Sequence, residues 1–321
     1  MKILVTGGAG FIGSHLAERL AMLGHTVCVL DALTDTYCTE LKTLNVRQLQ
    51  QRGIALLRLD LASDALGDAT HDVEFVFHLA AQPGISATLP FDAYARNNIL
   101  ATQRLLDALR HSNTLRGFIN VSTSSVYGCD ASGDEHTAPA PASDYGASKL
   151  AAEELVLARA RDEGLPACSL RLFSVYGPRE RPEKLYARLI GSLLEDREFP
   201  LFEGSARHQR SYTYVSDIID GMILAMDNIG RCKGEIFNIG AEASITTAQA
   251  IQVAESLAGK RARIVEQPKR SGDQMSTRAN IDKARRVLGY APRVSLRDGL
   301  TRQIAWYRGH ILGKMNLWQH G

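Results

Sequence analysis

The sequence predicts an α/β protein in which a doubly wound parallel sheet is followed by a smaller α/β region. Short apolar runs alternate with helical patterns in the first half, a glycine-rich turn follows the first run, and the second half has a different texture. A chain of 321 residues can form one large or two smaller domains with full cores. We expect a first domain over residues 1–172 with a return segment near 209–240, and a second domain mainly over 173–321.

The first half carries apolar runs of the length and composition of buried parallel strands, with helix-period patterns between them. The predicted strands cover residues 2–6, 26–30, 54–59, 73–78, 117–122 and 167–172. The predicted helices cover residues 14–23, 40–52, 91–110 and 143–163.

The second half is less regular and richer in arginine-containing loops, as expected for a region that covers a ligand. Its predicted strands cover residues 200–204, 209–214, 234–240 and 263–266. Its predicted helices cover residues 184–195, 246–259, 281–288 and 296–308, and a further helix begins at 215.

Composition excludes several functional classes. The 37 basic and 35 acidic residues nearly balance, so the chain offers no general surface for nucleic acid or membranes. No apolar stretch approaches the length of a membrane span, and the first strand begins at once, without a signal peptide. The five scattered cysteines have no metal-ligand spacing and indicate reduced thiols. We expect a cytoplasmic protein without a metal site.

The glycine-rich turn after the first strand points to a nucleotide. Gly7, Gly10 and Gly13 are spaced so that a pyrophosphate can approach backbone N–H groups at the start of a helix. Asp31 ends the second strand, where a carboxylate accepts hydrogen bonds from ribose hydroxyls and repels a 2′-phosphate. The order of strand, glycines, helix, strand and acid therefore favours NAD over NADP.

Three further polar residues end predicted strands at the edge where such sheets bind ligands. Asp60 is placed to accept a hydrogen bond from the adenine amino group, and Thr123 follows the fifth strand. His78 closes the fourth strand. Because no acid lies near it in the sequence, we predict a structural histidine rather than a proton shuttle.

Tyr145 and Lys149 are the most informative pair in the chain. A spacing of four places both side chains on one helix face. An ammonium near a phenol favours the phenolate, so the pair can supply a base near neutral pH. The Thr123 hydroxyl can hydrogen-bond the same substrate oxygen.

Together these motifs resemble the extended short-chain dehydrogenase/reductases, the NAD-dependent epimerase/dehydratase family. The resemblance covers nearly the whole chain, and the segment 175–182 is most similar to UDP-glucuronate 4-epimerases among the UDP-sugar 4-epimerases. It implies a Rossmann-type domain that keeps NAD tightly bound and a second domain that binds a nucleotide sugar. The cofactor residues that it implies are Gly7, Gly10, Phe11, Ile12, Gly13, Asp31, Asp60, Leu61, Leu79, Ala80, Ala81, Tyr145 and Lys149.

The resemblance also implies a mechanism. Tyr145 removes the proton of the sugar 4-hydroxyl while C4 delivers hydride to NAD, and Thr123 hydrogen-bonds the C4 oxygen. Lys149 lowers the pKa of the tyrosine and binds the nicotinamide ribose. The 4-keto sugar then turns over, hydride returns to its other face, and no net oxidation results.

The residues after Thr123 narrow the reaction. Dehydratases of this family carry an Asp-Glu pair there, and the decarboxylases keep a Glu where this chain has Ser125. Serine hydroxyls are very weak acids, so we rank dehydration and decarboxylation below epimerisation. Ser124, Ser125 and Ser174 are expected to donate hydrogen bonds to a C6 carboxylate, or to make room for a neutral substituent.

Substrate-binding residues are assigned by the same resemblance. Arg210 and then Arg270 are the expected diphosphate ligands, since guanidinium matches phosphate geometry. Arg181 faces the sugar or the loop beneath it, and Phe202 lies in the strand that lines the uracil site. For Arg179, a solvated loop position and a ligand position remain equally open.

Other positions keep alternatives open. Ser86 stands where glucuronate epimerases often have an arginine, which leaves a neutral UDP-hexose or UDP-N-acetylhexosamine as the alternative substrate. A dinucleotide-binding regulator without catalysis is the other functional class, and the tyrosine–lysine pair argues against it. A homodimer is expected through the helices 91–110 and 143–163. Their apolar residues either supply that interface or pack on the sheet; they are Leu105, Leu106, Leu109, Leu155 and Val156.

Overall fold

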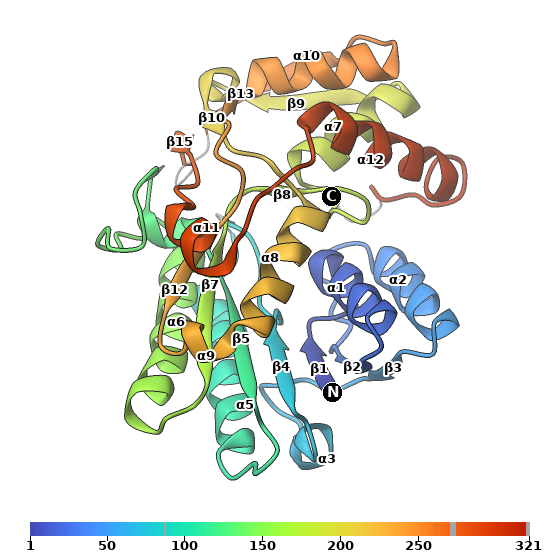
Figure 1. The fold of residues 1–321 in the computed structure, drawn as a ribbon. Coiled ribbons are helices and arrows are strands. Elements are labelled where there is room, and N and C mark those ends of the chain that lie inside the picture. Colours follow the sequence, from blue (N-terminus) through green and yellow to red (C-terminus); the bar gives the residue numbers. More distant parts are fainter. Residues whose placement is uncertain (87, 270–273, 319–321) are drawn as a thin grey trace.

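The structure, a computed structural model, describes residues 1–86, 88–269 and 274–318. Within these residues, seven parallel strands form one sheet in the order β12-β7-β5-β4-β1-β2-β3 (Figure 1). The predicted doubly wound sheet is therefore confirmed. The strands are β1 (Lys2–Thr6), β2 (Thr26–Leu30), β3 (Ala55–Leu57), β4 (Phe75–His78), β5 (Gly117–Thr123), β7 (Ala167–Leu172) and β12 (Ile236–Ile239).

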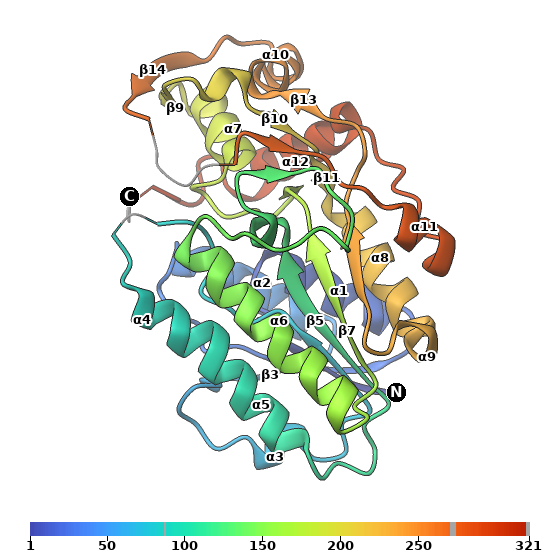
Figure 2. The ribbon, with the colours of Figure 1, turned by 90° about the vertical axis from the view of Figure 1, so that its left-hand side faces the viewer.

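Helices cover both faces of this sheet. One layer holds α1 (Phe11–Met22), α2 (Thr39–Gln51) and α8 (Val215–Asp227), and the short helix α9 (Ile229–Cys232) follows α8 (Figure 1). Figure 2 shows the other layer, in which a long helical segment and α6 cross the sheet side by side. This layer comprises α3 (Gly67–Thr70), α4 (Phe91–Tyr94), the π-helix η1 (Ala95–Leu100), α5 (Ala101–Leu109) and α6 (Asp144–Asp162).

The pleat of the central strand explains how both layers are held. Ile3 and Val5 of β1 point into one apolar cluster, which includes Leu16 of α1. Leu4 points to the other side, into a cluster with Leu105 of α5. All five side chains are fully buried. The continuous apolar run of β1 is thus explained by a strand covered on both faces.

The rest of the chain forms a smaller region over the carboxyl ends of the large sheet (Figure 1). Among the described residues it contains a four-stranded sheet in the order β13-β10-β15-β6 and two strand pairs, β8-β11 and β9-β14. Its strands are β6 (Asp130–Ala131), β8 (Val175–Tyr176), β9 (Glu198–Phe202), β10 (Gln209–Arg210), β11 (Thr213–Tyr214), β13 (Ile245–Thr246), β14 (Arg263–Gln267) and β15 (Ser276–Thr277). Its helices are α7 (Leu185–Glu195), α10 (Thr247–Ala258), α11 (Asp282–Leu288), α12 (Leu296–His310) and the 3₁₀ turns η2 (Ser124–Tyr127) and η3 (Ser205–Arg207).

The strands predicted over 54–59 and 200–204 have other limits, and two further predicted elements differ in kind. The strand predicted over 209–214 is two strands in different sheets, because the backbone changes partner: Ser211 N–H donates to Thr277 O and Thr213 N–H donates to Ser174 O, both at 3.0 Å. The helix predicted over 91–110 contains the π-helical stretch η1. The division into two domains stays a prediction, although β12 does return to the large sheet beside β7.

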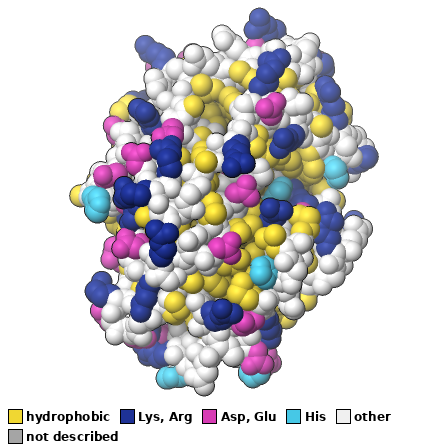
Figure 3. Space-filling view, viewed as in Figure 1, with side chains coloured by type: hydrophobic (Ala, Val, Ile, Leu, Met, Phe, Trp, Pro, Cys, Tyr) yellow, Lys and Arg dark blue, Asp and Glu magenta, His cyan; other side chains and the backbone are white. Residues whose placement is uncertain are grey.

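The surface carries no dominant charge on the face shown in Figure 3, where basic and acidic side chains are interspersed. In the part of the chain that the structure describes, no helix has the length and apolar character needed to cross a membrane.

Candidate active site

A cavity of about 470 Å³ lies at the carboxyl ends of the parallel strands. It is lined by the residue that directly follows each of five strands: Gly7, Asp31, Leu79, Ser124 and Phe173. The chain leaves β1 toward one face of the sheet and β4 toward the other, so a crevice opens between these neighbouring strands. Its size is in the range of small-molecule sites.

Every cofactor residue predicted from the sequence lines this cavity. The sequence therefore located the pocket wall, while the contacts that each residue makes with a cofactor stay predictions. The lining residues of this set are Gly7, Gly10, Phe11, Ile12, Gly13, Asp31, Asp60, Leu61, Leu79, Ala80, Ala81, Tyr145 and Lys149.

The glycine turn has a steric explanation. Gly7 has a φ of +69°, and a Cβ on it would lie 2.7 Å from the backbone nitrogen of Ala80. A Cβ on Gly13 would lie 2.4 Å from the carbonyl oxygen of Gly7. Side chains are thus excluded where β1, α1 and the segment after β4 approach one another. Gly10 has no side chain to cap α1, so the first-turn N–H groups can face an anion.

The adenosine side of the predicted site holds residues that the sequence did not reveal. Asp31 is fixed by backbone N–H groups of Ala9 at 3.1 Å and Leu33 at 2.8 Å. Lys42 lies 4.7 Å from the ring centroid of Tyr37, and both line the cavity. Burial lowers the pKa of Lys42, and the Asp31 carboxylate opposes that shift. Lys42 and Tyr37 were not predicted because they lie far from the glycine turn in the sequence. The one available signal was their place in the segment after the second strand.

Asp60 is held by neighbours rather than left open. Its Oδ2 atom accepts a hydrogen bond from Arg96 at 2.7 Å, and its Oδ1 atom accepts one from the Ala62 N–H at 2.8 Å. Burial acts to raise the pKa of Asp60, but the Arg96 contact and the Ala62 bond outweigh it and hold the pKa below its usual value. Asp60 therefore faces the cavity as a fixed carboxylate.

The three predicted catalytic side chains meet in this cavity. Thr123 ends β5, and Tyr145 and Lys149 lie one turn apart on α6. The Tyr145 hydroxyl is hydrogen-bonded to Thr123. A Cβ on Gly146 would lie 2.6 Å from the carbonyl oxygen of Ser125, so a glycine after Tyr145 lets α6 approach the turn that follows Thr123.

The environment shifts both titratable members of this group. Burial raises the pKa of the Tyr145 phenol, while the Arg181 guanidinium and the hydrogen bond with Thr123 act in the opposite direction. Burial lowers the pKa of Lys149 to about 8, and the Glu153 carboxylate opposes that shift. Lys149 thus remains protonated at neutral pH. The predicted effect of Lys149 on the pKa of Tyr145 stays a prediction.

The predicted sugar-facing serines also line the cavity. Ser124 and Ser125 begin the 3₁₀ turn η2, and the Thr123 Oγ1 atom caps that turn by accepting from the Ser125 N–H at 3.2 Å. Ser174 lies just after the end of β7, which is the neighbour of β5 in the sheet. Gln274, which the sequence did not reveal, donates to the Ser124 carbonyl oxygen at 3.2 Å. The Thr123 hydroxyl also donates to the Ser125 hydroxyl at 3.3 Å, so side chains of neighbouring segments help to hold this turn.

The predicted arginines separate into different environments. Arg181 and Arg210 line the cavity. Arg181 approaches the Pro83 carbonyl oxygen at 3.5 Å, and Arg210 donates to the carbonyl oxygen of Gln274. Arg270 lies outside the described residues. Phe202 is half-buried at the end of β9 and is not in the wall of the cavity that the described residues form.

Arg179 corrects both sequence interpretations, because it is neither solvated nor in the cavity wall. Its side chain is buried against α1 and α2, where it binds Glu18 at 2.8 Å, Gln48 at 2.5 Å and the Ser14 hydroxyl at 3.2 Å. The backbone of Arg179 is left-handed, with a φ of +68°. This loop therefore sends Arg179 into the helix layer, while the cavity receives Arg181 and the buried acid Glu180.

His78 has the structural environment that the sequence predicts. Its Nδ1 and Nε2 atoms bond the hydroxyls of Thr6 at 2.8 Å and Thr102 at 2.9 Å. The Thr102 hydroxyl donates its hydrogen to the carbonyl oxygen of Asn98, so His78 Nε2–H is the donor to Thr102. Burial, with a smaller contribution from the Lys149 charge, lowers the pKa of His78 to about 3. A neutral, fully bonded imidazole is not a proton shuttle.

Comparison with known proteins agrees with this geometry. Residues 3–240 match the NAD dependent epimerase/dehydratase family. The chain belongs to this family. The predicted family resemblance is thereby confirmed.

Individual relatives cover nearly the whole chain. The uncharacterized UDP-glucose epimerase YtcB of Bacillus subtilis is 38% identical, over 95% of this chain and 98% of its own length. UDP-glucuronate 4-epimerase 3 of Arabidopsis thaliana is 32% identical, over 97% of this chain and 77% of its own. The crystal structure of the UDP-glucuronic acid 4-epimerase of Bacillus cereus with UDP-glucuronic acid and NAD superposes with a TM-score of 0.91 at 38% identity, over 96% of this chain and 99% of that one.

Proposed function

We propose that the protein is an NAD-dependent UDP-sugar 4-epimerase whose substrate is UDP-glucuronate. The meeting of Thr123, Tyr145 and Lys149 in one cavity, directly beside Ser124 and Ser125, carries the proposal. The similarity to UDP-glucuronate 4-epimerases over nearly the full chain supports it. The tyrosine–lysine pair makes a dinucleotide-binding regulator without catalysis the weaker alternative.

The residues of the cavity fit NAD. The side-chain-free turn at Gly7, Gly10 and Gly13 leaves room for a pyrophosphate at the start of α1. Asp31 presents a fixed carboxylate to the ribose hydroxyls and would repel a 2′-phosphate. We assign Lys149, which lines the same cavity, to the nicotinamide ribose. The wall is completed by Phe11, Ile12, Asp60, Leu61, Leu79, Ala80 and Ala81.

Bound NAD supplies a hydride acceptor that returns the hydride after the sugar has turned, so no cofactor is consumed. Tyr145 takes the proton of the 4-hydroxyl and gives it back at the end of the cycle. Thr123 holds the C4 oxygen by a hydrogen bond and thereby fixes it against Tyr145. The protonated Lys149 provides a positive charge on the same helix face, which favours the phenolate form of Tyr145.

A glucuronate substrate needs a site that holds its carboxylate without an acid. The 4-keto intermediate is a β-keto acid, which loses carbon dioxide when the bond to the carboxylate aligns with the carbonyl π system. We propose that Ser124, Ser125 and Ser174 donate hydrogen bonds that keep the carboxylate out of that alignment. Neutral donors suit this task, because they orient the carboxylate without transferring a proton to it.

The charged side chains of the cavity are assigned to the diphosphate. Arg210 is the proposed first ligand, because it lines the cavity and a guanidinium matches the geometry of phosphate oxygens. Arg181 is proposed to reach the sugar or the adjoining phosphate. Arg270 and Phe202 remain predictions, the first because it lies outside the described residues.

Product analysis tests this function. The protein is incubated with UDP-glucuronate, UDP-glucose and UDP-N-acetylglucosamine, and the 4-epimers are separated. We expect turnover of UDP-glucuronate to exceed that of the neutral sugars. The carboxylate role is overturned if Ser124→Ala, Ser125→Ala and Ser174→Ala each leave UDP-glucuronate turnover unchanged.

A neutral UDP-hexose is the second candidate, and one observation favours it. Ser86, at the place of a common arginine, is exposed, and its hydroxyl accepts from the Thr88 and Leu89 N–H groups at 3.2 Å each. It therefore adds no positive charge near the sugar. The Bacillus subtilis relative is also named a UDP-glucose epimerase. Preferred turnover of UDP-glucose in the same incubation selects this candidate.

The proposed homodimer requires a revised interface. Leu105, Leu106 and Leu109 are buried against the sheet, as is Val156, so the packing interpretation of these residues is correct. Exposed apolar side chains of the same helical segment are Phe91 at 45% and Leu100 at 47%. We propose that the dimer contact centres on this amino-terminal part.

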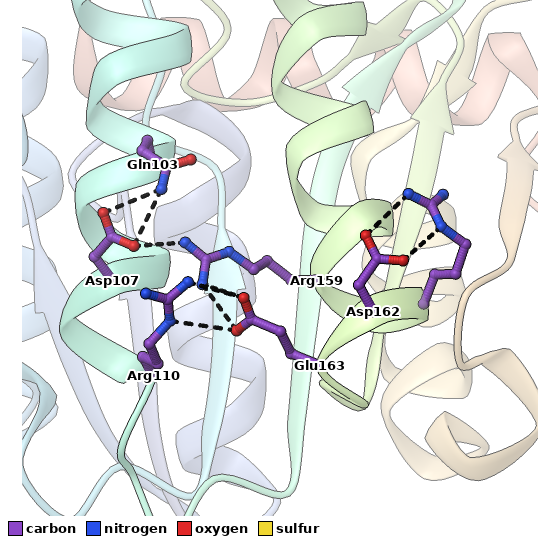
Figure 4. A network of polar contacts seen from close by, with 7 residues as sticks. Gln103, Asp107, Arg110, Arg159, Asp162 and Glu163 are labelled. Atoms are coloured by element: carbon purple, nitrogen blue, oxygen red, sulfur yellow. Dashed lines mark hydrogen bonds and ion pairs between the residues drawn. The ribbon is translucent and has the colours of Figure 1, made fainter.

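The other end of the two helices is polar. Figure 4 shows Arg159 of α6 between Asp107 of α5 and Glu163, with contacts of 2.5 and 2.7 Å. Solvent screens ion pairs with such exposed carboxylates, so they contribute little to stability. Sedimentation tests the proposal: Leu100→Glu is expected to give monomers, and Asp107→Ala is expected to remain dimeric. A monomeric wild type contradicts the dimer.

Scattered free cysteines support a cytoplasmic location as part of this proposal.

A further inference from the structure

A buried ion pair lies directly behind Lys149. Glu153 follows Lys149 by one turn of α6, and their exposed fractions are 0% and 4%. Arg171 of β7, which is 1% exposed, approaches Glu153 Oε1 through Nη2 at 2.5 Å and through Nε at 3.1 Å. The proposed mechanism leaves both residues without a task, yet they form the charged environment of the lysine.

The carboxylate of Glu153 is fixed on both oxygens. Its Oε2 atom accepts hydrogen bonds from the Ser169 hydroxyl at 3.0 Å and from Arg171 Nε at 3.2 Å. Asn120 of β5 in turn donates to Ser169 at 2.9 Å. Two strands of the sheet thus hold this carboxylate in place, and it has no freedom to turn toward solvent.

Arg171 also contacts the turn that follows Thr123. Its guanidinium lies 4.7 Å from the ring centroid of Tyr127, the last residue of the turn η2. The Tyr127 hydroxyl donates to Asn238 at 2.8 Å, which ties that turn to β12. Arg171 therefore connects the helix that carries Lys149 to the turn that begins after Thr123.

The charges around Lys149 can be compared one by one. On β4, His78 is neutral, since both of its ring nitrogens are bonded to threonine hydroxyls. On β7, Arg171 is positive, and across the cavity Arg181 is positive and acts on Tyr145. Glu153 is the negative charge that opposes the loss of the Lys149 proton. Burial disfavours the ammonium of Lys149, and the fixed carboxylate of Glu153 is the charge that opposes this effect.

We propose that Glu153 and Arg171 are positioning residues for the proposed epimerase chemistry: the Glu153 carboxylate keeps Lys149 protonated in its buried site, and Arg171 fixes that carboxylate. The inference rests on the proposed function, because it assumes that the charge of Lys149 supports the phenolate of Tyr145. Glu153 and Arg171 thus support the Tyr145–Lys149 pair, because the spacing of Tyr145 and Lys149 alone does not keep the lysine charged.

Removal of the carboxylate alone has a definite consequence. In Glu153→Gln, the carboxylate that opposes deprotonation of Lys149 is gone, while Lys149 stays buried. Lys149 then loses its proton at lower pH, because burial disfavours the ammonium and no anion compensates for it. The alkaline limb of the kcat profile, which reports groups in the enzyme–substrate complex, moves to lower pH.

The holoenzyme is compared with Glu153→Gln and with Glu153→Gln combined with Arg171→Gln. We expect the single variant to shift the alkaline limb down by about one pH unit or more and to lower kcat at neutral pH by roughly tenfold. The double variant loses the Arg171 cation together with the Glu153 anion. The alkaline limb of its kcat profile should therefore lie between those of wild type and the single variant.

The matched control is Glu255→Gln in α10. Glu255 is a buried acid, 8% exposed, paired with Arg261 at 2.7 Å, and it lies outside the cavity wall. Its profile should match that of wild type. Thermal unfolding and the NAD content of each variant, measured after denaturation, separate misfolding from a change in protonation.

An unshifted alkaline limb in folded, NAD-containing Glu153→Gln overturns the inference. If that variant yields no folded protein, the double variant decides: a limb equal to that of wild type overturns the inference, and a lower limb supports it. Failure of the proposed function has a different signature, namely turnover that persists in Tyr145→Phe. An inactive Tyr145→Phe together with an unshifted Glu153→Gln removes only the role of the ion pair.

Discussion

The two sides of the cavity differ in how they are built. The proposed cofactor side is built around strand ends of the large sheet, where the glycine turn, Asp31 and Thr123 lie, and helix α6 adds Tyr145 and Lys149; we call it the strand-built side. The proposed substrate side consists of three distant parts of the chain: the segment from Ser174 to Arg181, the short strand with Arg210, and the segment at Gln274; we call it the loop-built side. Strand ends fix side chains through sheet geometry, whereas loops fix them through individual contacts.

The largest expected effect lies on the strand-built side. Tyr145→Phe removes the proton acceptor while retaining the ring, so turnover should fall by at least roughly a thousandfold. NAD and UDP-sugar binding should remain, because the glycine turn and the arginines are untouched. Turnover and NAD content are measured on the same preparation. Retained activity removes Tyr145 from the proposed role.

Next in size is the loss of a diphosphate ligand on the loop-built side. Arg210→Ala should raise the KM for the UDP-sugar roughly 10- to 100-fold, the range expected for a hydrogen bond to a charged group, with a smaller change in kcat. Arg207→Ala, an exposed arginine three residues earlier, is the matched control. If both variants have the same KM, the loop-built side does not bind the diphosphate through Arg210.

Substitution of Arg179 tests whether this arginine stabilises the fold rather than binding substrate. Arg179→Met leaves Glu18 buried without its closest cation, so unfolding free energy should fall by about 3 kcal/mol. The KM of the folded enzyme should not change. Arg52→Met removes the more exposed partner of the same carboxylate, 3.4 Å away, and should cost under about 1 kcal/mol. A higher KM at unchanged stability in Arg179→Met would show that Arg179 binds the substrate.

The smallest expected effect concerns Glu180, a buried acid in the wall of the loop-built side. Burial raises its pKa to about 8, and a hydrogen bond from Gln303 partly offsets that shift. An acid with a raised pKa stabilises the fold below its unfolded value and loses that contribution as pH rises through 8. Glu180→Gln should therefore match wild type near pH 4 and melt higher, by roughly 5 °C, near pH 8. Equal melting temperatures at both pH values contradict this assignment.

The sequence predicted the strand-built side well, because its signals are local. Glycine at Gly7 and Gly13 reflects backbone contacts that exclude a side chain, and the spacing of Tyr145 and Lys149 is a helix property. Strand limits were correct to a residue for β1, β2 and β7.

The loop-built side was predicted less well, since its contacts are not periodic. A left-handed backbone at Arg179 decides which arginine reaches the cavity, and no sequence pattern indicated that conformation. The break between β10 and β11 depends on backbone donors that switch to distant partners. Phe202 was assigned by resemblance and lies outside the wall formed by the described residues. Lys42 and Gln274 reach the cavity from segments without a motif.

Transient oxidation at C4 is the central claim, and deuterium at that carbon tests it most directly. The holoenzyme is incubated with UDP-glucuronate deuterated at C4, and the product is examined by mass spectrometry and NMR. We expect the 4-epimer with deuterium retained at C4 and no release of carbon dioxide, because the same hydride returns to the same carbon. Loss of the label to solvent, or a decarboxylated product, would contradict the account.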